Sequence, residues 1–236
     1  VAVPAAGVLL GDWGADVTKI EPLDGDAHRG DISSILRRTG SKVNWRFEVH
    51  NRNKRSMALN LKQDAGRDIL YELVGSADVF MTNYEPATVD KLKIDYGSLK
   101  DVNPGLIYAS LSGYGKAGPD KNARGFDFTA AWARTGVQHL LCEPGASPPM
   151  APNGMMDRAT GTMMVAGVLA ALLHREKTGQ GQELELSLYH SGVWSLIADL
   201  QETMVGNTVA PRDRRNALNP LCNTYQTRDG LWVQLA

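Results

Sequence analysis

The sequence has little of several features that would assign it quickly to a class. Only two of its 236 residues are cysteines, Cys142 and Cys222, so no disulfide framework is indicated and a reducing, cytoplasmic location is expected. The formal net charge is −1, which gives no electrostatic reason to expect nucleic acid or an anionic membrane as a partner. No apolar run reaches the length of a membrane span, and no signal peptide is visible.

Familiar catalytic motifs are also missing. No Gly-x-Gly-x-x-Gly follows a strand, and the chain has neither a Walker phosphate loop nor a Gly-x-Ser-x-Gly nucleophile turn. The five histidines show no paired spacing that would bind a metal, so no metal is expected: His28, His50, His139, His174 and His190.

What the chain does have is an alternation of strand and helix patterns. Strands are predicted over residues 17–20, 56–61, 78–82, 106–111 and 183–188, and helices over 7–13, 64–75, 86 onward, 126–134, 159–175 and 193–205. Residues 22–44 read as an irregular loop that could include a turn of helix, and residues 225–232 as a hairpin with an Asp-Gly turn. Strands separated by helices predict an α/β fold with a Rossmann-like parallel sheet, in which ligands bind beyond the carboxyl ends of the strands.

One acidic residue stands out by its position. Asp157 follows a proline-rich loop and comes at the start of the long apolar helix predicted over residues 159–175. The free N–H groups and the positive dipole end of a helix favour an ionised carboxylate there. An N-cap is the ordinary role of such a residue, and a catalytic carboxylate is the alternative.

Several segments, in order along the chain, together resemble one family. They are Gly14 to Pro22, Asn51 to Ser56, Leu59 to Lys62, Asp78-Val79 with Asn83-Tyr84, Ser110 to Gly115, Gly125 to Asp127, Asp157 with Gly161, Leu169 to Leu172, and Lys177 to Gln182. In sequence and spacing they are similar to the class III CoA-transferases, the group of formyl-CoA and carnitine CoA-transferases. Three further segments most resemble the phenyllactate and 2-hydroxyisocaproate types: Pro4 to Gly7, Gly118 to Lys121, and Arg215 to Pro220.

The resemblance implies that Asp157 is a nucleophile, which attacks an acyl-CoA thioester to form first an acyl-aspartyl anhydride and then an aspartyl-CoA thioester. Backbone N–H groups near Gly154 or Gly161 are a hypothesis for stabilising the oxyanions. Carried over by position, the residues that contact CoA are Leu59, Asn60, Leu61, Lys62, Asn83, Tyr84, Glu85, Lys91, Arg124, Gly125, Phe126 and Asp127. Lys62, Lys91 and Arg124 suit its phosphates. Where formyl-CoA transferases have an arginine near the adenine, this chain has Pro22.

The resemblance also implies an organisation. The chain begins without Met and stops inside a strand-like run, so we expect residues 1–236 to be the N-terminal part of a large CoA-binding and catalytic domain, with the small domain and the C-terminal part absent. CoA and acyl-CoA are expected as substrates, without a permanently bound cofactor, and a 2-hydroxy acid or related organic acid as the acceptor. The expected assembly is an interlocked homodimer, or a heterodimer with a paralogue.

Two other functions share the pattern. The 2-methylacyl-CoA racemases have the same fold, but they need a histidine in a Gly-His-Asp segment, and here Phe126 occupies that position and cannot carry a proton. A non-catalytic CoA-binding subunit is the other alternative, and it would be expected to lack the nucleophile that Asp157 provides.

Overall fold

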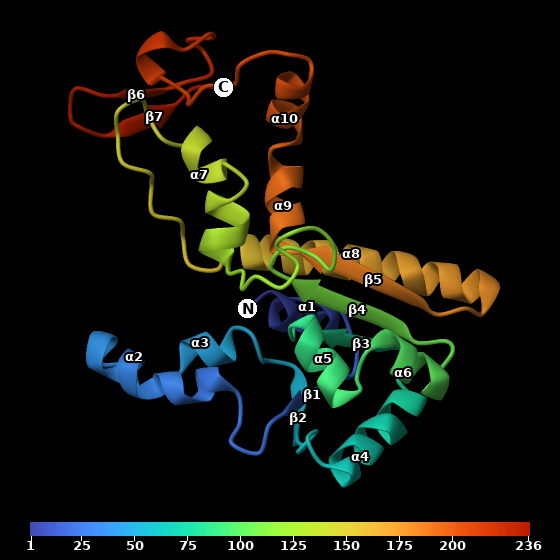
Figure 1. Cartoon of the computed structure of the whole chain (residues 1–236). Helices are drawn as coiled ribbons and strands as arrows, with labels where there is room; N and C mark the ends of the chain where they lie inside the picture. Colours follow the sequence, from blue (N-terminus) through green and yellow to red (C-terminus); the bar gives the residue numbers. More distant parts are fainter.

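The structure is a computed structural model that describes residues 1–236, apart from the side chain of Asp31. Its strands are β1 (Val17–Glu21), β2 (Lys54–Ala58), β3 (Val79–Thr82), β4 (Ile107–Ser112), β5 (Gln182–Ser187), β6 (Thr224–Gln226) and β7 (Trp232–Gln234). The α-helices are α1 (Ala2–Asp12), α2 (Ile32–Thr39), α3 (Trp45–Glu48), α4 (Asp64–Gly75), α5 (Pro86–Leu92), α6 (Tyr96–Val102), α7 (Val137–Leu140), α8 (Met155–Thr178), α9 (Leu188–Ser195) and α10 (Ile197–Met204). Two 3₁₀ turns, η1 (Ala27–Asp31) and η3 (Arg214–Asn216), and one π-helix, η2 (Asp127–Ala133), complete the set (Figure 1).

The strands form two parallel sheets and one hairpin. β1 pairs with β2, and β3, β4 and β5 pair in that order, all in parallel. β6 and β7 form the antiparallel hairpin predicted around Asp229-Gly230. The α/β class with parallel strands is therefore confirmed, with the parallel strands divided between two sheets.

β4 is the centre of the larger sheet, and its two faces meet two different cores. Ala109 and Leu111 pack with Met164, Val165 and Val168 of α8 on one face. Tyr108 faces the other way, into a cluster with Leu70 and Val74 of α4, Val89 of α5 and Leu99 of α6. This alternation follows from the two-residue period of a strand. Because β3, β4 and β5 are parallel, the loops that follow them lie at the same edge of the sheet.

α8 is held against α1 by a close approach of the two backbones. Gly161 makes this possible, because a Cβ atom there would lie 2.7 Å from the carbonyl oxygen of Ala2 and 3.2 Å from the nitrogen of Ala6. Gly161 is thus a packing residue in the second turn of α8. The role of N–H groups near Gly161 as oxyanion donors, considered from the sequence, stays a prediction.

α8 is also longer than the sequence pattern predicted. It begins at Met155, four residues before the expected start, and continues to Thr178. Within the described residues it is the one helix whose length and composition would allow it to cross a membrane. Its buried face, which includes Met164 and Val168, packs against β4 and α1, as expected for a core helix.

Two other segments differ from the prediction. Residues 22–44, expected to be irregular with at most a turn of helix, contain η1 and the longer, two-turn helix α2. The helix expected over residues 193–205 is divided at Leu196 into α9 and α10, which lead away from the sheet (Figure 1).

The end of β1 carries a buried ion-pair network. Glu21 is 4% exposed, and Arg29 donates to its two carboxylate oxygens from Nε and Nη2 at 2.7 Å each. The Ser56 hydroxyl donates to it at 2.7 Å and the Asp26 N–H at 2.9 Å. The hydrogen bonds from Arg29, followed by those from Ser56 and Asp26, lower the pKa of Glu21 to about 2 despite its burial. The network joins the loop after β1 to both strands of the small sheet.

We expect Glu21→Gln to lower the free energy of unfolding at pH 7 by about 3 kcal/mol, because the carboxylate is stabilised in the folded state and Arg29 loses its partner. The folded-state pKa is below the ordinary value of 4.5, so this contribution is complete above pH 4.5 and is lost as the pH falls towards 2. Urea unfolding at pH 7 and pH 3 should therefore show a difference between the two proteins that shrinks with acid. Asp16→Asn, which breaks an exposed pair with Arg55, is the control and should change little. A difference that is independent of pH would contradict the assignment.

Candidate active site

Asp157 lies in the first turn of α8, where it was expected, but it is not the N-cap. The N-cap is Gly154, which has no side chain to bond the helix end, and Asp157 is the third helical residue. The cap comes from another element: Oδ1 of Asp127, at the start of η2, accepts a hydrogen bond of 2.8 Å from the N–H of Asp157. Asp127 is 4% exposed, so this bond is shielded from water.

The carboxylate of Asp157 is consequently left free. Within the described part of the chain, no side chain or backbone group forms a hydrogen bond or ion pair with it, and the residue is half-buried. A helix-capping role, the ordinary explanation for an aspartate here, is therefore excluded by geometry. What remains is an unpaired carboxylate in a partly buried position, which is the state a nucleophile requires.

The electrostatics of the two aspartates are linked. Burial raises the pKa of Asp157, and the positive charge of Arg158 opposes that rise. Burial also raises the pKa of Asp127; the N–H of Asp157 lowers it, and the negative charge of Asp157 raises it again. Both carboxyl groups are thus more basic than usual, and a more basic carboxylate is a stronger nucleophile once ionised.

Asp127 has a second feature that bears on the site. Its Oδ2 is buried and has no hydrogen-bond partner among the described residues. The backbone of Met156 and Gly154 also lowers its pKa, and the N–H of Asp157 forms a hydrogen bond to its Oδ1. The role of N–H groups near Gly154 as oxyanion donors, considered from the sequence, stays a prediction.

The segments predicted to contact CoA follow the carboxyl ends of three strands. Leu59, Asn60, Leu61 and Lys62 follow β2; Asn83, Tyr84 and Glu85 lie between β3 and α5; Arg124, Gly125 and Phe126 lie between β4 and η2; and Asp127 begins η2. Lys91 is in the last turn of α5. The structure brings two of these segments together directly, because Arg124 Nε lies 3.4 Å from Glu85 Oε1.

Some of the side chains predicted to contact CoA are exposed, and others are buried or already engaged in other contacts. Leu59 is buried in the core beneath α4, and Asp127 is used as the cap of α8. Lys62, Lys91 and Arg124 are exposed, and neither lysine ammonium has a carboxylate partner among the described residues. Phe126 is 67% exposed. Gly125 packs so closely on Gly113 that a Cβ atom there would lie 2.5 Å from the Gly113 Cα, which fixes this loop against the end of β4.

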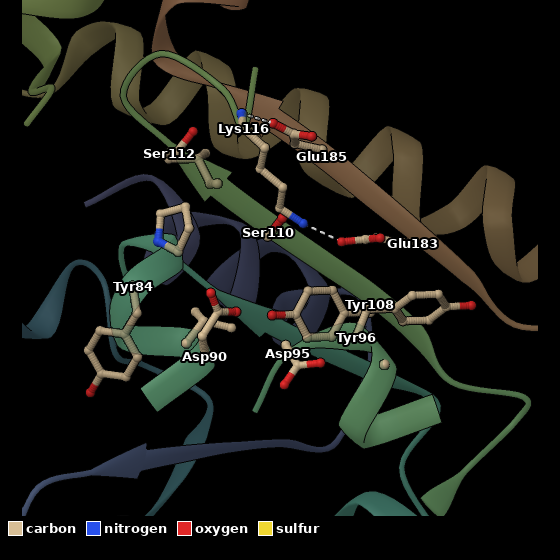
Figure 2. A pocket seen from close by; sticks show the side chains of 14 residues that line it. Tyr84, Asp90, Asp95, Tyr96, Tyr108, Ser110, Ser112, Lys116, Glu183 and Glu185 are labelled. Atoms are coloured by element: carbon tan, nitrogen blue, oxygen red, sulfur yellow. Dashed lines mark hydrogen bonds and ion pairs between the residues drawn. The ribbon is translucent and has the colours of Figure 1, made fainter. Parts of the chain in front are cut away.

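The structure also contains a cavity away from Asp157. A cavity of about 340 Å³, which the sequence gave no reason to expect, lies over β4 and β5; Tyr84 lines it and Asp157 does not (Figure 2). Among the described side chains, no three histidine, cysteine or acidic groups are placed to hold a metal ion.

Comparison with known proteins agrees with this geometry. The profile of CoA-transferase family III matches residues 1–236. (R)-2-hydroxy-4-methylpentanoate CoA-transferase of Clostridioides difficile is 39% identical over 236 residues, which cover 100% of this chain and 59% of that protein. Cinnamoyl-CoA:phenyllactate CoA-transferase of Clostridium sporogenes is 37% identical over 237 residues, which cover 100% of this chain and 58% of that protein. The chain thus spans less than two thirds of the length of either relative.

A solved structure has the same fold. The crystal structure of a CAIB/BAIF family protein from Brucella suis matches with a TM-score of 0.86 at 31% identity, over 98% of this chain and 61% of that one. The resemblance drawn from the motifs is confirmed across the whole chain. Sequence profile, relatives and fold agree: the chain belongs to CoA-transferase family III.

Proposed function

We propose that this chain carries the nucleophile and the CoA-contacting loops of an enzyme that moves CoA from an acyl-CoA to a free carboxylic acid. The observation that carries the proposal is the free, half-buried carboxylate of Asp157, whose helix-capping role Asp127 has taken over. Residues 1–236 would form the N-terminal part of the large catalytic domain. No metal enters the proposed chemistry, and no cofactor bound permanently is needed.

The proposed reaction consists of four acyl-transfer steps, all at the carboxylate of Asp157. Asp157 attacks the thioester carbonyl, the C–S bond breaks, and CoA leaves as a thiolate, which gives an acyl-aspartyl anhydride. The thiolate then attacks the aspartyl carbonyl and releases the donor acid, which gives an aspartyl-CoA thioester. The acceptor carboxylate attacks this thioester and expels the thiolate, and the thiolate finally takes the new acyl group and frees Asp157. Each step exchanges one activated acyl group for another.

Backbone N–H groups near Gly154 or Gly161 are proposed to stabilise the oxyanions. Tetrahedral oxyanions need preorganised donors close to the reacting carbonyl, and both glycines lie within two turns of Asp157 at the start of α8.

CoA is proposed to lie along the loops after β2, β3 and β4. Lys62 and Lys91 have no carboxylate partner among the described residues, so their ammonium groups are available to phosphates. The Arg124–Glu85 pair is exposed, with 82% and 59% of the two side chains accessible, and such a pair is weak enough to yield to a phosphate. Asn60, Asn83 and Tyr84 supply polar and aromatic groups between these cations.

The acceptor is proposed to be a 2-hydroxy acid or a related organic acid. This rests on the names of the two relatives, both of which contain an acid with a hydroxyl group next to its carboxyl. An interlocked homodimer, or a heterodimer with a paralogue, and a cytoplasmic location are also proposed, from the family resemblance. A racemase is disfavoured because Phe126, exposed beside Asp127, has no proton to exchange.

Asp157→Ala, made in the complete protein, should lower the exchange of label between acyl-CoA and free acid by about 10³-fold or more, because the anhydride cannot form. Asp64→Ala is the matched control, since Asp64 also lies in the first turn of a helix, and it should keep near-normal exchange. Hydroxylamine added during turnover should convert Asp157 to a hydroxamate that mass spectrometry detects. Exchange near the normal rate in Asp157→Ala, or an unmodified Asp157, would refute the covalent route.

Asp127→Asn keeps an oxygen to cap α8 but removes one of two neighbouring carboxyl groups, whose ionisations are coupled because the negative charge of Asp157 raises the pKa of Asp127. We expect the acid limb of kcat/KM to move to lower pH, because the remaining carboxyl group titrates without a second carboxyl group beside it. Asp127→Ala also loses the cap and should destabilise the protein by about 1–2 kcal/mol. An unchanged acid limb in a stable Asp127→Asn protein would show that the two carboxyl groups act independently.

Lys91→Ala should raise the KM for acyl-CoA about fivefold or more, because a charge-assisted bond to a phosphate is lost, and leave the KM for the acid unchanged. Lys177→Ala is the matched control, because Lys177 is also an exposed lysine in the last turn of its helix. If Lys91→Ala changed the KM for acyl-CoA and the KM for the acid equally, Lys91 would not be part of the CoA site.

A further inference from the structure

The cavity over β4 and β5 is separate from Asp157 and has a distinct construction. It measures about 340 Å³, a size that suits a small molecule or one large side chain. Its floor is the sheet, and its rim is formed by the segments that begin α5 and α6, which contribute Pro86 and Tyr96 (Figure 2). Tyr84 is the one residue that it shares with the predicted CoA contacts.

The floor is polar where a parallel sheet is normally apolar. On the α8 face, β4 and β5 present Ala109, Leu111, Leu184 and Leu186 to the core. On the cavity face, Tyr108 lies opposite Glu183 and Ser110 lies opposite Glu185 in the strand register. Parallel strands are usually covered by helices on both faces and carry apolar side chains on both. The polar side chains on this face therefore favour contact with a polar group.

The wall is strongly acidic. Asp90, Asp95, Glu183 and Glu185 face one lysine, Lys116, which leaves three formal negative charges. Lys116 is already engaged, because its ammonium pairs with Glu183 and its backbone N–H donates to Glu185, as Figure 2 shows. A polyanion such as CoA would be repelled here.

Lys116 also shows how an ammonium group is accommodated. Its Nζ lies 5.8 Å from the centroid of the Tyr108 ring while it pairs with Glu183. A cation held by a carboxylate over an aromatic face is the usual arrangement for recognising organic cations. Tyr84 and Tyr96 supply two further rings in the same cavity.

Tyr108 has a hydroxyl that lacks a partner. The residue is 1% exposed, and no described residue forms a hydrogen bond with its hydroxyl. Burial, with the negative charge of Glu183, raises the pKa of Tyr108, so the hydroxyl stays protonated. The hydroxyl oxygen itself is not fully enclosed; it is open to the cavity that Tyr108 lines, so a group bound there can pair with it.

We propose that this cavity is a second binding site, which takes an organic cation: an alkylammonium or guanidinium group lying over the tyrosine rings and paired with Glu183 and Glu185. Such a group can belong to a free amine or to an arginine or lysine side chain of a polypeptide. The chemistry of recognition is the same for both. The site is independent of acyl transfer at Asp157.

Agmatine, which has a guanidinium at one end and an ammonium at the other, is the probe. Its binding to the complete protein is followed by saturation-transfer NMR and calorimetry, with uncharged butylurea as the matched ligand. Glu183→Gln should weaken agmatine binding about tenfold, because one charge-assisted contact is lost. Lys116→Gln should tighten it several-fold, because the competing ammonium is removed. Glu176→Gln, at an exposed site on α8 outside the cavity, should change nothing.

A cation site predicts that agmatine affinity falls in Glu183→Gln and rises in Lys116→Gln. A general effect on folding would change the affinity in the same direction in both variants. Tighter binding of N-acetyl-arginine amide than of agmatine would assign the cavity to a polypeptide side chain, and the reverse order to a free amine. Absence of agmatine binding, equal binding of butylurea, or shifts of the same sign in the two variants would overturn the proposal. None of these results depends on whether Asp157 transfers acyl groups.

Discussion

The hydrogen bond from the N–H of Asp157 to Oδ1 of Asp127 is the contact on which the candidate site depends. It joins two segments that are thirty residues apart and that belong to different helices, η2 and α8. Because Asp127 caps α8, Asp157 is released from the capping role that an aspartate in this position usually has. The same bond places two carboxyl groups near one another in a partly buried region, where burial raises the pKa of both and the negative charge of Asp157 raises that of Asp127 further. Helix capping by Asp127 and the release of the Asp157 carboxylate are thus one arrangement.

The arrangement is rigid because both sides are anchored. On one side, α8 packs on α1 at Gly161, where no side chain separates the helices. On the other, the loop that carries Asp127 packs its Gly125 backbone on Gly113 at the end of β4. β4 is buried on both faces, so the position of this loop is fixed by the most enclosed strand of the sheet. A nucleophile needs this precision, since small displacements of reacting groups reduce rates strongly.

The sequence predicted the boundaries of an element correctly where neighbouring residues alone determine them. The helix over residues 64–75 was predicted at both ends, from Asp64 and Gly75, and the Asp-Gly hairpin was found from its turn. The start of α8 was placed four residues late, because its cap is a side chain from another element, which no local pattern reveals. The cavity was missed for a similar reason. Glu183 and Glu185 read as the exposed side of an ordinary strand, and only the register with Tyr108 and Ser110 shows that they form a wall.

The distribution of charge separates the two sites. Lys62 follows β2 and Lys91 ends α5, and neither has an acidic partner among the described residues, whereas the carboxylates of β5 line the cavity beside β4. The net charge of −1, taken over the whole chain, does not reveal this difference. A ligand with several phosphates is drawn to the first region and repelled from the second, and an organic cation behaves in the opposite way. One sheet can therefore have two sites, one that favours anionic ligands and one that favours cations, and Tyr84 lies at the boundary between them.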